Sequence, residues 1–200
     1  SIHVVLNELM EIKMKELLNN RKVVNVPHGF MKETGKMMKP SYLCEGEKFL
    51  FCPINSNYDA DFLSTLFGSQ ILLDYLSINR IKIVLKSKLL GDVIHPNLVG
   101  VNGRFSDEEY CYLMSKALAI VLPYSDMFKY RCSGIFFECV ANDAVIISSR
   151  IPDIEIYREK ARLCFFGSPL EFVDCLENLK FINPIKDTQS LNNVQAGWEN

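Results

Sequence analysis

The stretch that decides the fold is residues 118–149, "LAIVLPYSDMFKYRCSGIFFECVANDAVIISS". Its two ends, residues 118–124 and 144–149, are apolar runs rich in Val and Ile, which is typical of buried strands. Between them, residues 133–143 predict a helix that begins at a Ser-Gly pair. A strand, a helix and a second strand in this order predict a βαβ unit with parallel strands.

The same alternation continues on both sides of this unit. Near-continuous apolar strands that alternate with helices indicate a parallel sheet covered on both faces. Because crossovers between parallel strands are right-handed, the leading prediction is an α/β fold with a doubly wound, Rossmann-like sheet. Further strands are expected over residues 48–54, 80–87, 97–103 and 162–168, and helices over residues 59–77, 106–117, 153–161 and 169–182.

The sequence divides into three parts. Residues 1–21, with a short strand and an amphipathic helix, are interpreted as the end of a preceding domain or a linker. Residues 22–182 hold the Rossmann-like domain, and the polar residues 183–200 are expected to form a C-terminal tail or a crossover helix. Because the chain begins with Ser on a strand and stops abruptly, we expect it to be a piece of a longer protein.

Composition narrows the class of protein. Two hundred residues with 48% hydrophobic and 23% charged content are typical of one soluble globular domain. The net charge of -2, without a long basic block, argues against a nucleic-acid surface. No apolar run reaches the length of a membrane span, and the start lacks a signal-peptide pattern. The seven cysteines form no CxxC pair, and Cys139, Cys164 and Cys175 lie in apolar runs, which predicts reduced thiols of a cytosolic protein.

The loop before the central helix has the features of an anion site. Ser133 and Gly134 open the helix, where free N–H groups and the helix dipole favour a phosphate. Arg131 stands just before them and is placed to neutralise a second oxygen. Ligands of doubly wound sheets lie outside the carboxyl ends of the strands, and this loop follows such an end.

Glu138 is the most informative residue of this helix. It lies within "GIFFECVA", which is apolar nearly all round, so its carboxylate is expected on a buried face and in need of a partner. Its distance from Ser133 suits the two hydroxyls of a ribose, so phosphate and ribose together predict a bound nucleotide. The alternative is that Ser133 only caps the helix and that Glu138 is solvated or salt-bridged.

These residues resemble a known family. Residues 112–154, "YLMSKALAIVLPYSDMFKYRCSGIFFECVANDAVIISSRIPDI", resemble the C-terminal, donor-binding half of a GT-B glycosyltransferase of the glycosyltransferase family 4 type. Within them "ECVANDAVII" is similar to the family's E-A-x-A-x-G-x-P-V-I stretch, with Glu138 at the ribose-binding acid. Residues 23–30, "VVNVPHGF", resemble the start of the family's second domain, and residues 97–117 its base-binding strand and helix.

The resemblance implies an activity. The parent protein is expected to move a sugar from a UDP-sugar or GDP-sugar to a glycan or lipid-linked acceptor, in surface polysaccharide synthesis. A missing N-terminal domain would hold the acceptor, so we expect this fragment to be inactive alone. The diphosphate would be stabilised by helix N–H groups and Arg131, with no cofactor and no obligatory metal. The expected location is cytoplasmic, at the inner face of the membrane, without nucleic acid as a partner.

The resemblance also implies further site residues. Gly103 is expected to let the base approach the backbone, with Arg104 and Phe105 beside it; the alternative is an ordinary turn glycine. Tyr124 and Tyr130 flank the phosphate loop and are expected at the diphosphate or the sugar, as is Asn55 after the first strand; packing at the rim is an equal alternative for the tyrosines. No residue is assigned as catalytic.

Departures from the family pattern leave a second function open. The family's other acid stands eight residues before the ribose-binding one, and here that position is Tyr130. The basic pair that meets the diphosphate is not evident after the first strand, so Arg131, Lys86 or Lys88 would replace it. The alternative function is a non-catalytic nucleotide-binding or interaction domain.

One pair of acids has two interpretations. Asp59 and Asp61 are spaced like the metal-binding acids of the other glycosyltransferase fold, but they open a predicted helix, where acids favour the dipole. We therefore expect no metal site.

Overall fold

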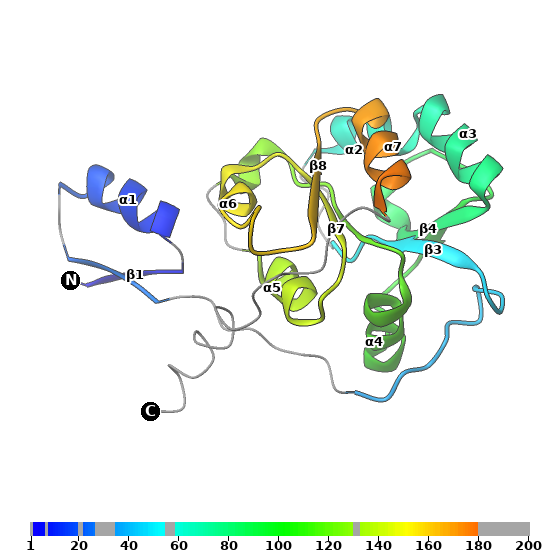
Figure 1. The fold of residues 1–200 in the computed structure, drawn as a ribbon, viewed down its shortest axis with the longest axis horizontal. Helices are drawn as coiled ribbons and strands as arrows, with labels where there is room; N and C mark the ends of the chain where they lie inside the picture. Colours follow the sequence, from blue (N-terminus) through cyan, green and yellow to red (C-terminus); the bar gives the residue numbers. More distant parts are fainter. Residues whose placement is uncertain are drawn as a thin grey trace.

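The computed structural model describes residues 2–6, 8–19, 22–26, 35–54, 59–129 and 133–179. Most of these residues form a six-stranded sheet with helices packed on it (Figure 1). The strands are β3 (Lys48–Phe51), β4 (Ile81–Lys86), β5 (Leu98–Val101), β6 (Ile120–Leu122), β7 (Ile146–Ser149) and β8 (Leu163–Phe166).

The order of these strands is that of a doubly wound sheet. The order is β5-β4-β3-β6-β7-β8, and every neighbouring pair is parallel, with Leu50 opposite Ile83 and Val121 opposite Ile147. The chain enters this sheet in its middle at β3, adds β4 and β5 on one side, and then returns to form β6 on the other side of β3. The crevice between β3 and β6 is therefore the switch point where such sheets bind ligands. The predicted Rossmann-like fold is confirmed.

Helices cover both faces of the sheet. Figure 1 shows α2 (Ala60–Phe67), α3 (Gln70–Asn79) and α7 (Pro169–Glu177) on one face, and α4 (Asp107–Lys116) and α5 (Gly134–Ala141) on the other. The core lies between them, and Leu50, Ile83 and Ile120 are fully buried. The shorter turns are η1 (Ser87–Leu89), η2 (Asp126–Phe128) and α6 (Pro152–Glu155). Among the helices that the structure describes, none is long and apolar enough to cross a membrane.

Two predicted helices differ from the structure. The single helix expected over residues 59–77 is two helices, because α2 ends at Gly68 and α3 begins after Ser69. Gly68 N–H donates to the Ser64 carbonyl, and a Cβ at Gly68 would lie only 2.6 Å from that oxygen. The helix expected over residues 153–161 is also shorter, since α6 ends at Glu155 and gives way to turns.

A second, smaller unit lies at the N-terminal end of the described chain. Strands β1 (His3–Val5) and β2 (Val23–Asn25) form a parallel two-stranded sheet, joined by α1 (Glu8–Leu17). None of the α1 residues is buried, so the apolar face that the sequence predicted for this helix covers no core within the described chain. The division into residues 1–21, 22–182 and 183–200 stays a prediction, and the last part lies outside the described residues.

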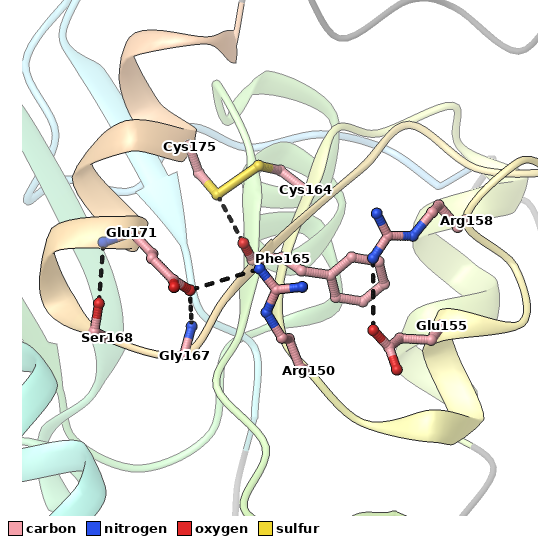
Figure 2. A network of polar contacts seen from close by, with 9 residues as sticks. All are labelled: Arg150, Glu155, Arg158, Cys164, Phe165, Gly167, Ser168, Glu171 and Cys175. Carbon is pink, nitrogen blue, oxygen red and sulfur yellow. Dashed lines mark hydrogen bonds and ion pairs between the residues drawn. A yellow bond between two sulfur atoms is a disulfide. The ribbon is translucent and has the colours of Figure 1, made fainter.

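The structure corrects one prediction about cysteines. Cys164 on β8 and Cys175 on α7 form a disulfide, with their Cα atoms 6.0 Å apart (Figure 2). The two residues come together because α7 packs back against the strand that precedes it, a contact that cysteine spacing does not reveal. The prediction of reduced thiols is therefore wrong for this pair. Cys139 and Cys52 are buried thiols that form no disulfide.

Candidate functional site

An open pocket lies at the carboxyl ends of the central strands. Its volume is about 320 Å³, and it is bounded by the ends of β3 and β4, the loop after β5, and helices α4 and α5. We call it the sheet-end pocket. Its lining residues are Pro53, Lys86, Arg104, Phe105, Asp107, Tyr110, Ile135 and Glu138. The edge of the sheet at which it lies is the one where doubly wound folds bind their ligands.

Glu138 lines this pocket from α5, but its surroundings differ from the prediction. Its neighbours Phe137 and Cys139 are buried, whereas Glu138 itself is half-buried at the wall of the pocket. Its carboxylate also has a protein partner, because the Tyr110 hydroxyl donates a hydrogen bond of 2.7 Å to Oε2. The expectation of a carboxylate on a buried face is therefore wrong. Although α5 is apolar nearly all round, one side of the helix lines the pocket, and Glu138 lies on that side. Ile135, one helical turn before Glu138, lines the same side.

The start of α5 is built around Ser133. Its Oγ accepts a hydrogen bond of 3.1 Å from the Phe136 N–H, so Ser133 is the N-cap of the helix. The same Oγ is hydrogen-bonded to the hydroxyl of Tyr124, which is only 6% exposed. Burial raises the pKa of Tyr124 well above its ordinary value. Ser133 therefore caps the helix, as the alternative interpretation of the sequence predicted, and Gly134 is the first helical residue.

The loop between β5 and α4 forms the opposite wall. Gly103 has a φ of +76°, and a Cβ there would meet no atom within 4 Å, so the backbone conformation rather than crowding favours glycine. Phe105 is 7% exposed and packs edge-on against Phe51 at 5.2 Å between ring centroids. Its ring is therefore part of the core as well as the pocket wall. Arg104 is exposed at the rim.

Lys86 places a cation in the floor of the pocket. It is 5% exposed, and its ammonium group donates to the Gly103 carbonyl oxygen and lies 3.6 Å from the centroid of the Phe105 ring. Burial lowers the pKa of Lys86, and the neighbouring charges of Lys88 and Arg104 lower it further. Sequence reasoning offered Lys86 only as a replacement for a missing basic residue, and the structure brings it to the pocket.

A smaller cavity lies between the ends of β3 and β6. Its volume is about 10 Å³, and Tyr124 lines it together with residues on either side of the switch point. Asp59 also contributes, and its side chain caps α2 by accepting from the Phe62 N–H at 2.9 Å. Asp59 therefore lies at the start of a helix, which is the interpretation that was preferred over a metal site.

The structure thus gathers some predicted residues and leaves others untested. Glu138, Arg104 and Phe105 line one pocket together with Lys86, whose ammonium group donates to the Gly103 carbonyl. The lining of this pocket does not include Gly103, Ser133 or Gly134, and Tyr124 lines the smaller cavity. Arg131, Tyr130 and Asn55 lie outside the described residues. The residues that sequence reasoning missed are Pro53, Asp107, Tyr110 and Ile135. Of these only Ile135 carried a signal, its spacing of three from Glu138 on one helix.

Comparison with known proteins supports the fold alone. No protein-family model matches the chain, and no curated protein matches it. Among solved structures, a trehalose-6-phosphate synthase, OtsA, has a TM-score of 0.61 at 12% identity, over 96% of this chain and 53% of that one. A UDP-forming alpha,alpha-trehalose-phosphate synthase from Burkholderia vietnamiensis has a TM-score of 0.59 at 10% identity, over 98% of this chain and 55% of that one.

A third similar structure is a putative UDP-N-acetylglucosamine 2-epimerase from Listeria monocytogenes, with a TM-score of 0.52 at 12% identity over 77% of this chain and 45% of that one. The chain therefore spans about half of the length of the solved structures that it matches. Its six-stranded parallel sheet and helices correspond to the Rossmann-like half of a GT-B fold. The chain thus has a glycosyltransferase-like fold.

Proposed function

We propose that this chain binds the nucleotide-diphosphate part of a sugar donor, UDP-sugar or GDP-sugar, in the sheet-end pocket. The observation that carries the proposal is the position of Glu138. Its carboxylate faces the pocket just over one turn into α5, whose N-terminus is capped by Ser133. A ribose at Glu138 and a diphosphate at the start of α5 make one continuous ligand path.

The charges of the pocket support this ligand. Two cations, Lys86 and Arg104, and two acids, Asp107 and Glu138, line the pocket, and Glu138 is the acid proposed to bind the diol. The first N–H groups of α5 add the positive end of the helix dipole, which favours phosphate. Arg131 and Asn55 remain proposed contacts of the diphosphate, and Tyr124 and Tyr130 of the diphosphate or the sugar.

For the whole protein we propose glycosyl transfer of the glycosyltransferase family 4 type. Helix N–H groups and Arg131 would stabilise the diphosphate leaving group without an obligatory metal, and a further domain would hold a glycan or lipid-linked acceptor. Surface polysaccharide synthesis at the inner face of the membrane remains the proposed setting. The UDP-forming synthase among the similar structures is consistent with a UDP donor.

Binding measurements test the nucleotide site. Isothermal titration of the chain with UDP and with GDP should give binding for at least one of them, and Glu138→Ala should weaken it by about tenfold or more. Glu177→Ala, which removes an exposed acid at the end of α7 on the other face of the sheet, is the matched control and should leave the affinity unchanged. Absence of binding of both nucleotides at millimolar concentration would refute the proposal.

A non-catalytic nucleotide-binding or interaction domain is the second candidate. The feature that favours it is Tyr130, which stands where the similar family has the acid facing the transferred sugar. Release of UDP or GDP from the sugar donor by the complete protein separates the two functions. Nucleotide binding without any turnover would favour the non-catalytic domain.

A further inference from the structure

Tyr110 and Glu138 meet across the sheet-end pocket from two different helices. Tyr110 belongs to α4 and Glu138 to α5, 28 residues further along the chain, and the tyrosine hydroxyl donates to Glu138 Oε2 at 2.7 Å. Both side chains line the pocket. We propose that Tyr110 is a positioning residue that holds Glu138 ready for a ribose and so sets the preference of the site for ribonucleotides over deoxyribonucleotides.

The ring of Tyr110 is held firmly enough for this role. It packs edge-on against Phe51, with the ring centroids 5.7 Å apart, and Phe51 is fully buried on the central strand β3. The start of α4 is fixed by a capping box, in which Ser106 and Glu109 exchange hydrogen bonds of 3.2 Å. The Tyr110 hydroxyl therefore has a defined place relative to the sheet.

The hydrogen bond fixes a side chain that would otherwise have several conformations. A glutamate loses rotamer entropy when it is immobilised, at a cost of up to about 2 kcal/mol. Because Tyr110 already restricts Glu138 in the free protein, a ligand meets a pre-organised acceptor and binds with a smaller loss of entropy. Tyr110→Phe keeps the aromatic ring that packs on Phe51 and removes the hydroxyl that donates to Glu138.

The contact also leaves the carboxylate free to bind a diol. A carboxylate has about four lone-pair sites, and the hydroxyl of Tyr110 occupies one of them on Oε2. Oε1 and the remaining site on Oε2 can accept from the 2′- and 3′-hydroxyls of a ribose. Among the described residues Glu138 has no ion-pair partner, so Tyr110 orients the carboxylate without neutralising its charge.

Selectivity follows from this geometry. A 2′-deoxynucleotide donates one hydrogen bond fewer, and one acceptor site of the immobilised carboxylate then stays unpaired, which is costly in a partly buried pocket. A carboxylate without this restraint could reorient toward water, so the missing 2′-hydroxyl would cost less binding free energy. The penalty against a deoxyribose should therefore depend on Tyr110.

The inference rests on the proposed function, and the experiment keeps the two apart. Dissociation constants of UDP, dUDP, GDP and dGDP are measured by titration calorimetry for the wild-type chain and for Tyr110→Phe. We expect the wild type to prefer the ribonucleotide by about tenfold, and Tyr110→Phe to bring this ratio close to one by weakening mainly the ribonucleotide. Tyr112→Phe, on the same helix but stacked on Phe49, is the control and should keep the wild-type ratio.

The outcomes separate the positioning role of Tyr110 from the nucleotide site itself. An unchanged ratio in Tyr110→Phe, while Glu138→Ala weakens binding by about tenfold or more, overturns the positioning role and leaves the nucleotide site standing. If no nucleotide binds the wild type, both proposals are overturned. Glu138→Gln is the second variant, and loss of the ratio there as well as in Tyr110→Phe supports the pair acting together. Because a ratio of two affinities is insensitive to a general loss of folded protein, a merely structural role of Tyr110 would not move it.

Discussion

Lys86 at the end of β4 is hydrogen-bonded through its ammonium group to the carbonyl oxygen of Gly103, 17 residues further along the chain. The same group lies 3.6 Å from the centroid of the Phe105 ring, and the side chain is 5% exposed. A buried cation therefore holds the loop that brings Arg104 and Phe105 to the sheet-end pocket. The contacts of Lys86 with Gly103 and Phe105 therefore also fix this wall of the pocket.

Replacement of this anchor should weaken ligand binding more than stability. Lys86→Met keeps an apolar stem but removes the hydrogen bond and the cation. We expect the free energy of unfolding to fall by only about 1 kcal/mol, since relief from the desolvation that lowers the pKa of Lys86 offsets part of the loss. Affinity for UDP or GDP should fall by about tenfold. Urea unfolding and calorimetry measure both, with Lys116→Met, at an exposed position in the last turn of α4, as control; equal affinities in Lys86→Met and wild type would contradict the expected role.

The start of α5 allows a test by double-mutant cycle. Ser133→Ala removes the N-cap, at a cost of about 1 kcal/mol, and leaves the buried hydroxyl of Tyr124 without its partner, at about 1–3 kcal/mol. In a Tyr124→Phe background, Ser133→Ala should cost only the cap. Urea unfolding of the four proteins should therefore give a coupling energy of about 1–3 kcal/mol. Strictly additive costs would show that the contact between Ser133 and Tyr124 contributes nothing to stability.

The predictability of the fold has a local cause. Most strands of the large sheet are near-continuous apolar runs such as residues 48–54, and each is separated from the next by a helical pattern or a turn. Such apolar runs and helical patterns can be recognised from neighbouring residues alone, without knowledge of contacts between distant parts of the chain. The break between α2 and α3 was missed, although Gly68 and Ser69 are a turn signal within an apolar helix.

The site was predictable only in part, since its contacts depend on packing. Glu138 was identified because a carboxylate is unusual within an apolar helix, and the structure places it at a pocket. Tyr110 is its hydrogen-bond donor, and no period or motif connects residues 28 apart on different helices. The anchor between Lys86 and Gly103 and the disulfide between Cys164 and Cys175 were missed for the same reason.

Buried thiols should make the protein less stable at alkaline pH. Burial raises the pKa of Cys52 from its ordinary 9.0 to about 12, and also raises that of Cys139. Between pH 9 and 12 the folded Cys52 keeps a proton that the unfolded chain has lost, so the free energy of unfolding falls as pH rises, by up to about 1.4 kcal/mol per pH unit for each thiol.

Urea unfolding at a series of pH values in this range measures the slope. Cys52→Ala should make the decline shallower, whereas Cys44→Ala, at an exposed position, should leave it as in the wild type. The same slope in Cys52→Ala and wild type would contradict the assignment to this thiol.

The disulfide between Cys164 and Cys175 should stabilise the edge of the sheet. It closes a loop between residues 11 apart, and for that length the chain-entropy model gives about 3 kcal/mol. A reductant should therefore lower the urea midpoint of the wild type and leave that of the Cys164→Ala/Cys175→Ala double variant unchanged. Nucleotide affinity should survive reduction, because Figure 2 shows a second attachment at the start of α7: Glu171 accepts from the Gly167 N–H at 2.7 Å and lies 3.7 Å from Arg150. Equal wild-type midpoints with and without reductant would show that the disulfide does not stabilise the fold.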